Sequence, residues 1–420
     1  MTPSPSTRSA FGGVNPHALA TILEASETKT IIAATDIFDL SGTKLWARDQ
    51  PVSAALQRKL LDRQLRQPLE SCLVAEDGVT GLTLANALQE LVESASALVP
   101  ILRPHIARLT REVAQLPLHP VAQLLLTVGQ TARPQAFEHA VQAMALNGAL
   151  MAGNGGGVPE VRLAMLSGLL HDLGEMYIDP SHGEVEAERE LDFTSYQQLV
   201  VHPHVGQLLI TQLTNYPSVI ARAIAEHHER LDGSGYPHAL TGAAMSPLGR
   251  LLAVTEASLG ALRGHVDHLL HASVALRAVP GEFDSHWAGK ISQATCAQPV
   301  PNALMELGDI QARLGALGDV LQRAEAGASQ LAAQAKSPAL KSAADLSVFL
   351  LGRLRAGWNE SGMWNPHAMT QADAAEVEAV EDELYRRLRG VQRAALLRAG
   401  ALPPEEAHAL GAMCDALAMG

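Results

Sequence analysis

Hydrophobic residues recur at helical spacing through most of the chain. After Pro51, for example, Leu56, Leu60 and Leu65 fall on one face of a helix. The same rhythm predicts further helices over residues 81–98, 101–115, 118–131, 136–151, 159–173, 202–213, 218–229 and 246–263. From residue 132 to residue 263 no segment alternates with a period of two. The pattern therefore predicts a mainly α protein whose central part is an all-α helical bundle.

The N-terminal part differs because it contains short β-type runs. Residues 1–16 are rich in Pro, Ser and Gly, which is typical of a flexible tail. Residues 30–34 have the sequence TIIAA, and residues 41–43 predict a hairpin turn with residues 45–46 on the returning strand. Residues 17–130 contain no recognisable catalytic set. We interpret them as a small α+β region with a regulatory, sensory or packing role.

The C-terminal part, residues 301–420, is predicted to be a separate helical region. A heptad-like series of apolar residues runs through Leu307, Ile310, Leu314, Leu317, Leu321, Ala324, Ala328 and Leu331. Such a series favours a helix packed on its own domain, and its alternative is a coiled coil between two copies in a homodimer. A final helix is predicted from Thr370, with Asp373 completing a capping box, to about Leu397.

Composition and charge narrow the possible functions. In a chain of 420 residues, 47% hydrophobic and 18% charged residues indicate a soluble globular protein. The net charge of -13 argues against a nucleic-acid polymer or an anionic membrane as partner, because both favour basic surfaces. No apolar run is long enough to span a bilayer, and the N-terminus lacks the apolar core of a signal peptide. Three isolated cysteines without metal-site spacing fit a reducing cytoplasm, which is the expected location.

Two pairs of metal-binding residue types are the main candidates for chemistry. His171 and Asp172 end an apolar helix, and His227 and His228 end another. A buried Asp172 would be costly without a strong partner, which a cation, an arginine or a helix cap can provide. The paired histidines lead directly into the turn-forming segment 232–237, DGSGYP. The sequence thus indicates a metal centre with a loop beside it.

These residues carry a resemblance to a known family. The segment HHERLDGSGYP, residues 227–237, resembles the HHExxDGxGYP signature of HD-GYP domains, which belong to the HD metal-dependent phosphohydrolases. HDLGE at 171–175 resembles the family's HDxGK motif, and HPHVG at 202–206 resembles its third histidine motif. Residues 246–262 resemble the stretch that holds the family's last metal-binding aspartate. The resemblance implies an HD-GYP-like domain over residues 131–300, with an HD-type helical bundle.

The resemblance also implies a two-metal site. The family's metal-binding positions fall on His139, His171, Asp172, His202, His227, His228 and Glu256. Asp172 would bridge two divalent ions, while Glu256 stands where the family usually has aspartate. Histidine and carboxylate ligands favour iron or manganese. Gln135 replaces a glutamate that helps to hold a third ion in some members, so two ions are expected rather than three.

Members of the family hydrolyse cyclic di-GMP to pGpG, or onward to GMP, in bacterial signalling. The implied mechanism uses a hydroxide activated by two metal ions, with His171 and Asp172 as catalytic residues. By the same resemblance, Gly235 and Tyr236 of the loop would contact the substrate. Glu175 and Arg263 would also contact the substrate.

At several positions expected to bind the substrate, this sequence differs from the family's motifs. Glu175 replaces the lysine of HDxGK, which puts a negative charge where a positive one would help to bind phosphate. Leu259 stands at the family's second aspartate position, and RGHVDHLLH replaces its basic phosphate-binding segment. Arg263, His265 or His268 are candidates to take over that role. Two alternatives to a cyclic di-GMP phosphodiesterase therefore stay open: a degenerate HD-GYP protein that binds metal, nucleotide or partners without turnover, and an HD phosphohydrolase for another phosphoester.

Overall fold

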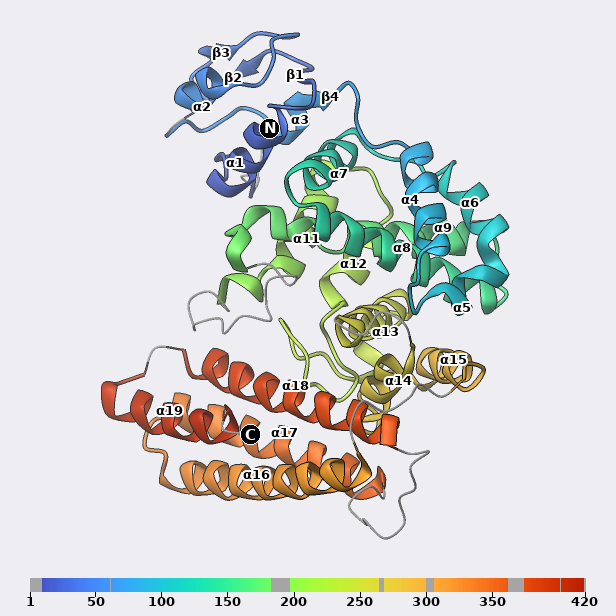
Figure 1. Ribbon diagram of the computed structural model, residues 1–420. Coiled ribbons are helices and arrows are strands. Elements are labelled where there is room, and N and C mark those ends of the chain that lie inside the picture. Colours follow the sequence, from blue (N-terminus) through green and yellow to red (C-terminus); the bar gives the residue numbers. More distant parts are fainter. Residues whose placement is uncertain are drawn as a thin grey trace.

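The computed structural model describes residues 10–60, 62–182, 197–263, 268–299, 306–361, 374–400 and 402–418. The chain is mainly helical, with two small strand pairs near the N-terminus, as the sequence predicts. Figure 1 shows the strand-containing region at one end, a central group of helices and a bundle of long helices at the other end. In the described residues, no helix combines the length and apolarity needed to cross a bilayer.

The N-terminal region is built around two antiparallel strand pairs. Its elements are α1 (Pro16–Ala25), β1 (Ile31–Ala33), β2 (Ile37–Phe38), β3 (Lys44–Trp46), α2 (Ala54–Leu60), α3 (Leu69–Cys72) and β4 (Leu73–Ala75). The hairpin predicted around residues 41–43 is confirmed, because β2 pairs with β3 across this turn. The predicted strand at residues 30–34 is also present as β1, and its partner is the distant β4. A pairing across so many residues leaves no local signal in the sequence.

The next helices are shorter than the hydrophobic pattern predicts. They are α4 (Gly81–Glu93), α5 (Val99–Leu102), the 3-10 turn η1 (Arg103–His105), α6 (Ile106–Val113) and α7 (Pro120–Ala132). The helix predicted over 81–98 is present but shorter, because α4 ends at Glu93 and is capped by Ser94, whose hydroxyl donates to the carbonyl of Leu91. The single helix predicted over 101–115 is wrong, since it is interrupted near Pro104, which has no backbone N–H to continue the helix.

The central helices match the predicted bundle closely. They are α8 (Pro134–Gly153), α9 (Val158–Leu170), η2 (Leu173–Tyr177), η3 (Pro180–His182), α11 (His202–Leu213), α12 (Ser218–Glu226), η5 (Gly242–Ala244), α13 (Pro247–Leu262), α14 (Leu270–Arg277) and α15 (Ser285–Cys296). One hydrophobic core extends from Phe11 to Ile291. The N-terminal region and the central helices therefore share a core, and Tyr177 of η2 donates its hydroxyl hydrogen to the buried Glu70 of α3.

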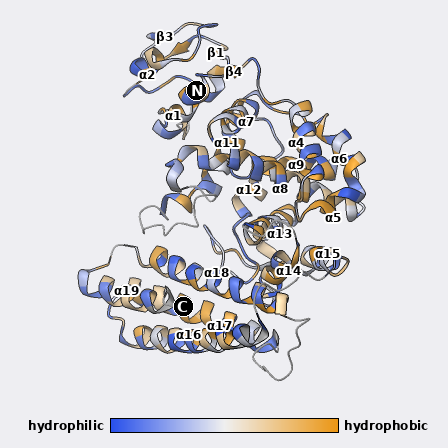
Figure 2. Cartoon of the chain, viewed as in Figure 1, coloured by the Kyte–Doolittle hydropathy of each residue, from blue (hydrophilic) through white to orange (hydrophobic). Residues whose placement is uncertain are grey.

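The C-terminal helices form a bundle with a second core. They are α16 (Leu307–Gln334), α17 (Pro338–Ser361), α18 (Ala374–Ala399) and α19 (Pro404–Ala418). Leu314, Leu321 and Leu331 of the heptad-like series are buried against the other helices of this bundle. These three residues thus pack within the chain, and Figure 2 shows hydrophobic and hydrophilic residues side by side along these helices. The predicted cap at Thr370 and Asp373 lies outside the described residues.

Candidate metal centre

The seven residues named as metal ligands come together in the middle of the central bundle. Each lies at or near a helix end, except Glu256, which lies inside α13, and His139, which lies on the second turn of α8. His171 and Asp172 follow α9, His202 is the first residue of α11, and His227 and His228 follow α12. Helix ends place side chains at the centre of a bundle without breaking its packing. The structure therefore gathers residues that are spread over more than a hundred positions.

The first cluster contains two histidines and two carboxylates. The Nε2 atoms of His139 and His171 lie 3.0 Å and 3.1 Å from the Glu256 Oε2 atom. The same Nε2 atoms lie 3.4 Å and 3.0 Å from the Asp172 Oδ2 atom. All the ligand atoms of this cluster lie within 4.8 Å of one another. This mixture of imidazole and carboxylate is a common ligand set for divalent transition metals.

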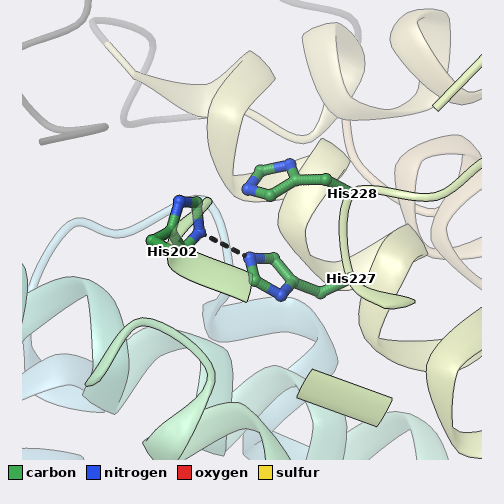
Figure 3. A group of neighbouring side chains, drawn as sticks. All are labelled: His202, His227 and His228. Carbon is green, nitrogen blue, oxygen red and sulfur yellow. Dashed lines mark hydrogen bonds between the residues drawn. The ribbon is translucent and has the colours of Figure 1, made fainter. Parts of the chain in front are cut away.

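The second cluster contains three histidines. Figure 3 shows the rings of His202, His227 and His228 pointing toward one another, with the Nε2 atoms of His202 and His227 only 3.0 Å apart. The three rings are buried, and their ligand nitrogens lie within 4.8 Å of one another. The Asp172 Oδ1 atom lies 3.4 Å from the Nε2 atoms of both His202 and His227. This second oxygen of Asp172 thus completes the cluster.

Asp172 connects the two clusters through opposite oxygens of one carboxylate. Its Oδ2 faces His139 and His171, whereas its Oδ1 faces His202 and His227. Within the described part of the chain, the buried Oδ1 atom has no hydrogen-bond partner. A carboxylate in this arrangement can bridge two cations, one on each side.

The proton positions of the histidines fit metal ligation. The Nδ1 atoms of His171, His202 and His227 lie 2.6 to 2.7 Å from the backbone carbonyls three residues earlier. A carbonyl only accepts hydrogen bonds, so Nδ1 carries a proton, and in the neutral ring Nε2 presents a lone pair. Two lone pairs that face each other at 3.0 Å, as in His202 and His227, repel unless a cation lies nearby. The second cluster therefore fits a metal ion better than a hydrogen-bonded core.

Burial and neighbouring charged groups shift the pKa values of the two clusters in opposite directions. Burial and the neighbouring His228 and His202 lower the pKa of His227 to about 3, so this ring stays neutral. In the first cluster burial opposes ionisation, but the charges of Asp172 and Glu256 outweigh it and raise the pKa of His171 well above its ordinary value. His171 in turn holds the pKa of Asp172 well below its usual range. The two carboxylates of the first cluster thus favour positive charge there, either as a second proton on His171 or as a cation in its place.

Close backbone packing and a polar contact below the centre fix the ligands. A side chain at Gly174 would meet the carbonyl oxygen of His202 at 2.0 Å, so only glycine lets η2 approach the start of α11. Beneath the centre, the buried Asn147 of α8 donates to the carbonyl of Ala164 in α9 and accepts from the hydroxyl of Thr255 in α13. The side-chain amide of Asn147 therefore holds together α8, α9 and α13, the helices that carry or precede ligands of the first cluster.

The DGSGYP loop folds back over the second cluster. The carboxylate of Glu229 is buried and accepts hydrogen bonds from the backbone N–H groups of His238 and Leu240. Glu229 therefore holds the loop. Tyr236 stacks on His228, with ring centroids 4.5 Å apart and an interplanar angle of 16°. A side chain at Gly235 would meet the His228 carbonyl oxygen at 2.4 Å, so the loop can lie this close only with glycine.

A large cavity opens beside this loop, between the central bundle and the C-terminal helices. Its volume is about 1080 Å³, which is sufficient for a nucleotide-sized ligand. His228, Glu256, Gly235, Tyr236 and Arg263 line it, so the cavity reaches both clusters. Its lining also contains nine arginines: Arg230, Arg263, Arg313, Arg353, Arg386, Arg387, Arg389, Arg393 and Arg398.

Most of these arginines were not predicted from the sequence. Seven of the nine come from the C-terminal helices, which the motifs do not cover. Arg386, Arg389 and Arg393 do share a helix face by their spacing. That spacing is common on solvated helices, so it gave no signal of a site by itself.

The other residues considered for substrate binding lie elsewhere. Glu175 is buried in η2 and is not among the residues that line the cavity. Its negative charge acts on Arg133, which donates to the Glu175 backbone carbonyl at 2.8 Å. His268 is bonded to the Pro299 carbonyl at 2.8 Å, and His265 lies outside the described residues. Among the alternatives for the missing basic segment, Arg263 is the one at the cavity, with its Nη2 atom 3.8 Å from the Glu256 Oε1 atom.

Comparison with known proteins agrees with this geometry. Residues 133–266 match the HD domain family. A cyclic di-GMP phosphodiesterase of Pseudomonas aeruginosa is 27% identical over 208 residues, which cover 49% of this chain and 47% of the relative. The 3'3'-cGAMP-specific phosphodiesterase 1 of Vibrio cholerae is 28% identical over 137 residues, 32% of this chain and 31% of the relative.

A third relative is the cyclic di-GMP phosphodiesterase response regulator RpfG of Xanthomonas campestris. It is 34% identical over 98 residues, 23% of this chain and 25% of the relative. The chain thus spans less than half the length of each of these three relatives. No solved structure matches the chain significantly. Residues 133–266 are therefore an HD domain, distantly homologous to the HD-GYP phosphodiesterases of cyclic di-GMP and cGAMP.

Proposed function

We propose that this protein is a metal-dependent phosphodiesterase that hydrolyses cyclic di-GMP to pGpG or GMP. The observation that carries the proposal is the Asp172 carboxylate, whose two oxygens each face one cluster of buried histidines. His139, His171, Glu256 and Asp172 would hold one divalent ion. His202, His227, His228 and the other oxygen of Asp172 would hold a second. Iron or manganese fits this ligand set best.

The protein's own groups have distinct roles in this proposal. Two divalent ions would lower the pKa of a water molecule and stabilise negative charge on the phosphate and on the leaving oxygen. The backbone carbonyls at Gly168, Leu199 and Ile224 keep three imidazoles in the tautomer that can bind a cation. Tyr236 and Gly235 form the wall of the cavity above His228, where a nucleotide can be oriented.

The proposal is tested by measuring hydrolysis directly. The purified protein is loaded with Mn²⁺ or Fe²⁺, and the turnover of cyclic di-GMP is followed by chromatography beside an Asp172→Ala control. We expect linear products from the native protein and a loss of at least about a thousandfold in the control, because both clusters lose a shared ligand. Metal-loaded protein without turnover would overturn the proposal, and undiminished turnover in the control would show that the site is misassigned.

A second substrate is favoured by one of the comparisons. The name of the relative from Vibrio cholerae states that it is specific for 3'3'-cGAMP. A mixed dinucleotide carries the same two phosphodiester groups, so the metal clusters would treat both alike. The same chromatographic assay with 3'3'-cGAMP decides between them, since the ratio of the two kcat/KM values reports the preference of the cavity.

A further inference from the structure

The cavity beside the metal clusters is much more basic than the rest of the protein. Nine arginines and five carboxylates line it, whereas the whole chain has a net charge of -13. Within the HD domain only Arg230 and Arg263 contribute. Arg230 is half-buried, with its Nε atom 3.6 Å from Glu282 and its guanidinium over the Phe283 ring at 4.7 Å. The remaining positive charge of the cavity comes from α16, α17 and α18.

Some of these arginines are used to dock the C-terminal bundle. Arg387 of α18 binds Glu383 and Glu282 and donates to the Ala275 carbonyl at 3.1 Å. The Nε atom of Arg353 of α17 lies 3.4 Å from Asp232 Oδ2 in the DGSGYP loop. These contacts hold α18 and α17 against the central bundle beside the cavity. Leu397, near the end of α18, packs in the small apolar cluster to which Tyr236 also belongs.

Arg389 differs from the docking arginines, and Arg393 lies beside it on α18. They lie four residues apart, so their side chains project from the same face of α18, and both line the cavity. Arg389 is exposed and has no ion-pair partner in the described parts of the chain. A guanidinium that faces a cavity without a carboxylate partner is well suited to a phosphate, which it can bind through two parallel hydrogen bonds.

We infer that α18 completes the substrate site, with Arg389 and Arg393 binding the phosphates of the cyclic dinucleotide. They supply the positive charge that Glu175 and the replaced basic segment do not provide. This inference rests on the proposed function, and it makes the C-terminal bundle part of the substrate-binding site rather than an independent appendage. It also explains why a cavity next to two clusters of ligands is lined by arginines from outside the HD domain.

The test uses the full-length protein with Arg389→Gln and Arg393→Gln combined. We expect KM for cyclic di-GMP to rise by about tenfold for each arginine, with kcat nearly unchanged, because each charged hydrogen bond to phosphate is lost from binding. The double Arg389→Lys and Arg393→Lys variant should recover part of the affinity, since it keeps the charge but not the paired geometry. Arg323→Gln is the matched control, because Arg323 is exposed on α16 and does not line the cavity.

Each outcome decides the inference separately from the proposed function. If the native protein turns over cyclic di-GMP and the glutamine variant keeps its KM, the inference is wrong and the function stands. A lower KM or a higher kcat would show that α18 obstructs the site, which also overturns it. If the native protein shows no turnover, the proposed function fails, and equilibrium binding of labelled cyclic di-GMP decides the role of α18. Weaker binding in the glutamine variant alone would support that role, and equal or absent binding would refute it.

Discussion

Asp172 is the residue whose replacement tests the architecture of the metal centre most directly. Asp172→Asn keeps the size of the side chain but removes the charge that both clusters share. Loss of a group that only orients a metal ligand lowers metal affinity by about 10- to 100-fold. Asp172 contacts four imidazoles at 3.0 to 3.4 Å, so removing its charge should weaken metal binding further. We expect a loss of more than about 2.7 kcal/mol of metal-binding free energy at each cluster. The variant should therefore lose metal from both clusters.

The stoichiometry of bound metal separates a shared ligand from an ordinary one. After loading and dialysis, elemental analysis should give about two ions per chain for the native protein. His228→Asn should retain about one ion, because His228 belongs to the second cluster alone. His204→Asn is the control, since His204 is exposed on α11 and outside both clusters. Asp172→Asn with native metal content, or with the same content as His228→Asn, would refute the reasoning.

Two further variants test the loop and the buried contact with the N-terminal region. Gly235→Ala should lower kcat/KM at least tenfold and destabilise the protein by about 1–3 kcal/mol in urea unfolding, because the added Cβ atom would overlap the His228 carbonyl. Unchanged kinetics would contradict the close approach of the loop that we infer at Gly235. Burial raises the pKa of Glu70, so its folded pKa exceeds the unfolded value and its contribution to stability is lost as pH rises above about 4.5. Glu70→Gln should therefore raise the melting temperature at pH 7, with a gain that disappears near pH 4; a gain that is equal at both pH values would show that ionisation is not the cause.

Local sequence patterns were sufficient to predict the helices of the central bundle. Apolar residues predict α8, α9, α11, α12 and α13 because all five pack in a single core. The helices α11 and α12 bury one face, whereas long stretches of α8, α9 and α13 are buried on all sides. Helix ends were less predictable where Ser94 and Pro104 interrupt an otherwise helical pattern. The pairing of β1 with β4 could not be predicted, since strands separated by other elements carry no shared local signal.

The candidate ligands were predictable for a different reason. Motifs such as HD and HHE keep adjacent metal-binding residues together in the chain, so the residue types and their order are visible without a structure. Only the structure assigns His139 and Glu256 to one cluster and His202, His227 and His228 to the other. That assignment depends on which Nδ1 atom finds a backbone carbonyl and on which oxygen of Asp172 faces each ring.

By itself, then, the sequence determined the mainly α fold, the family resemblance and the identity of the seven candidate ligands. The tertiary structure decided how Asp172 is shared, where Glu175 lies and which surface faces the site. Residues on α18 stand far from the HD motifs along the chain, and their helical spacing is equally compatible with a solvated face. Docking of the C-terminal bundle through ion pairs brings Arg389 and Arg393 to the cavity. Contacts between distant segments depend on the packing of whole helices, and no local pattern specifies them.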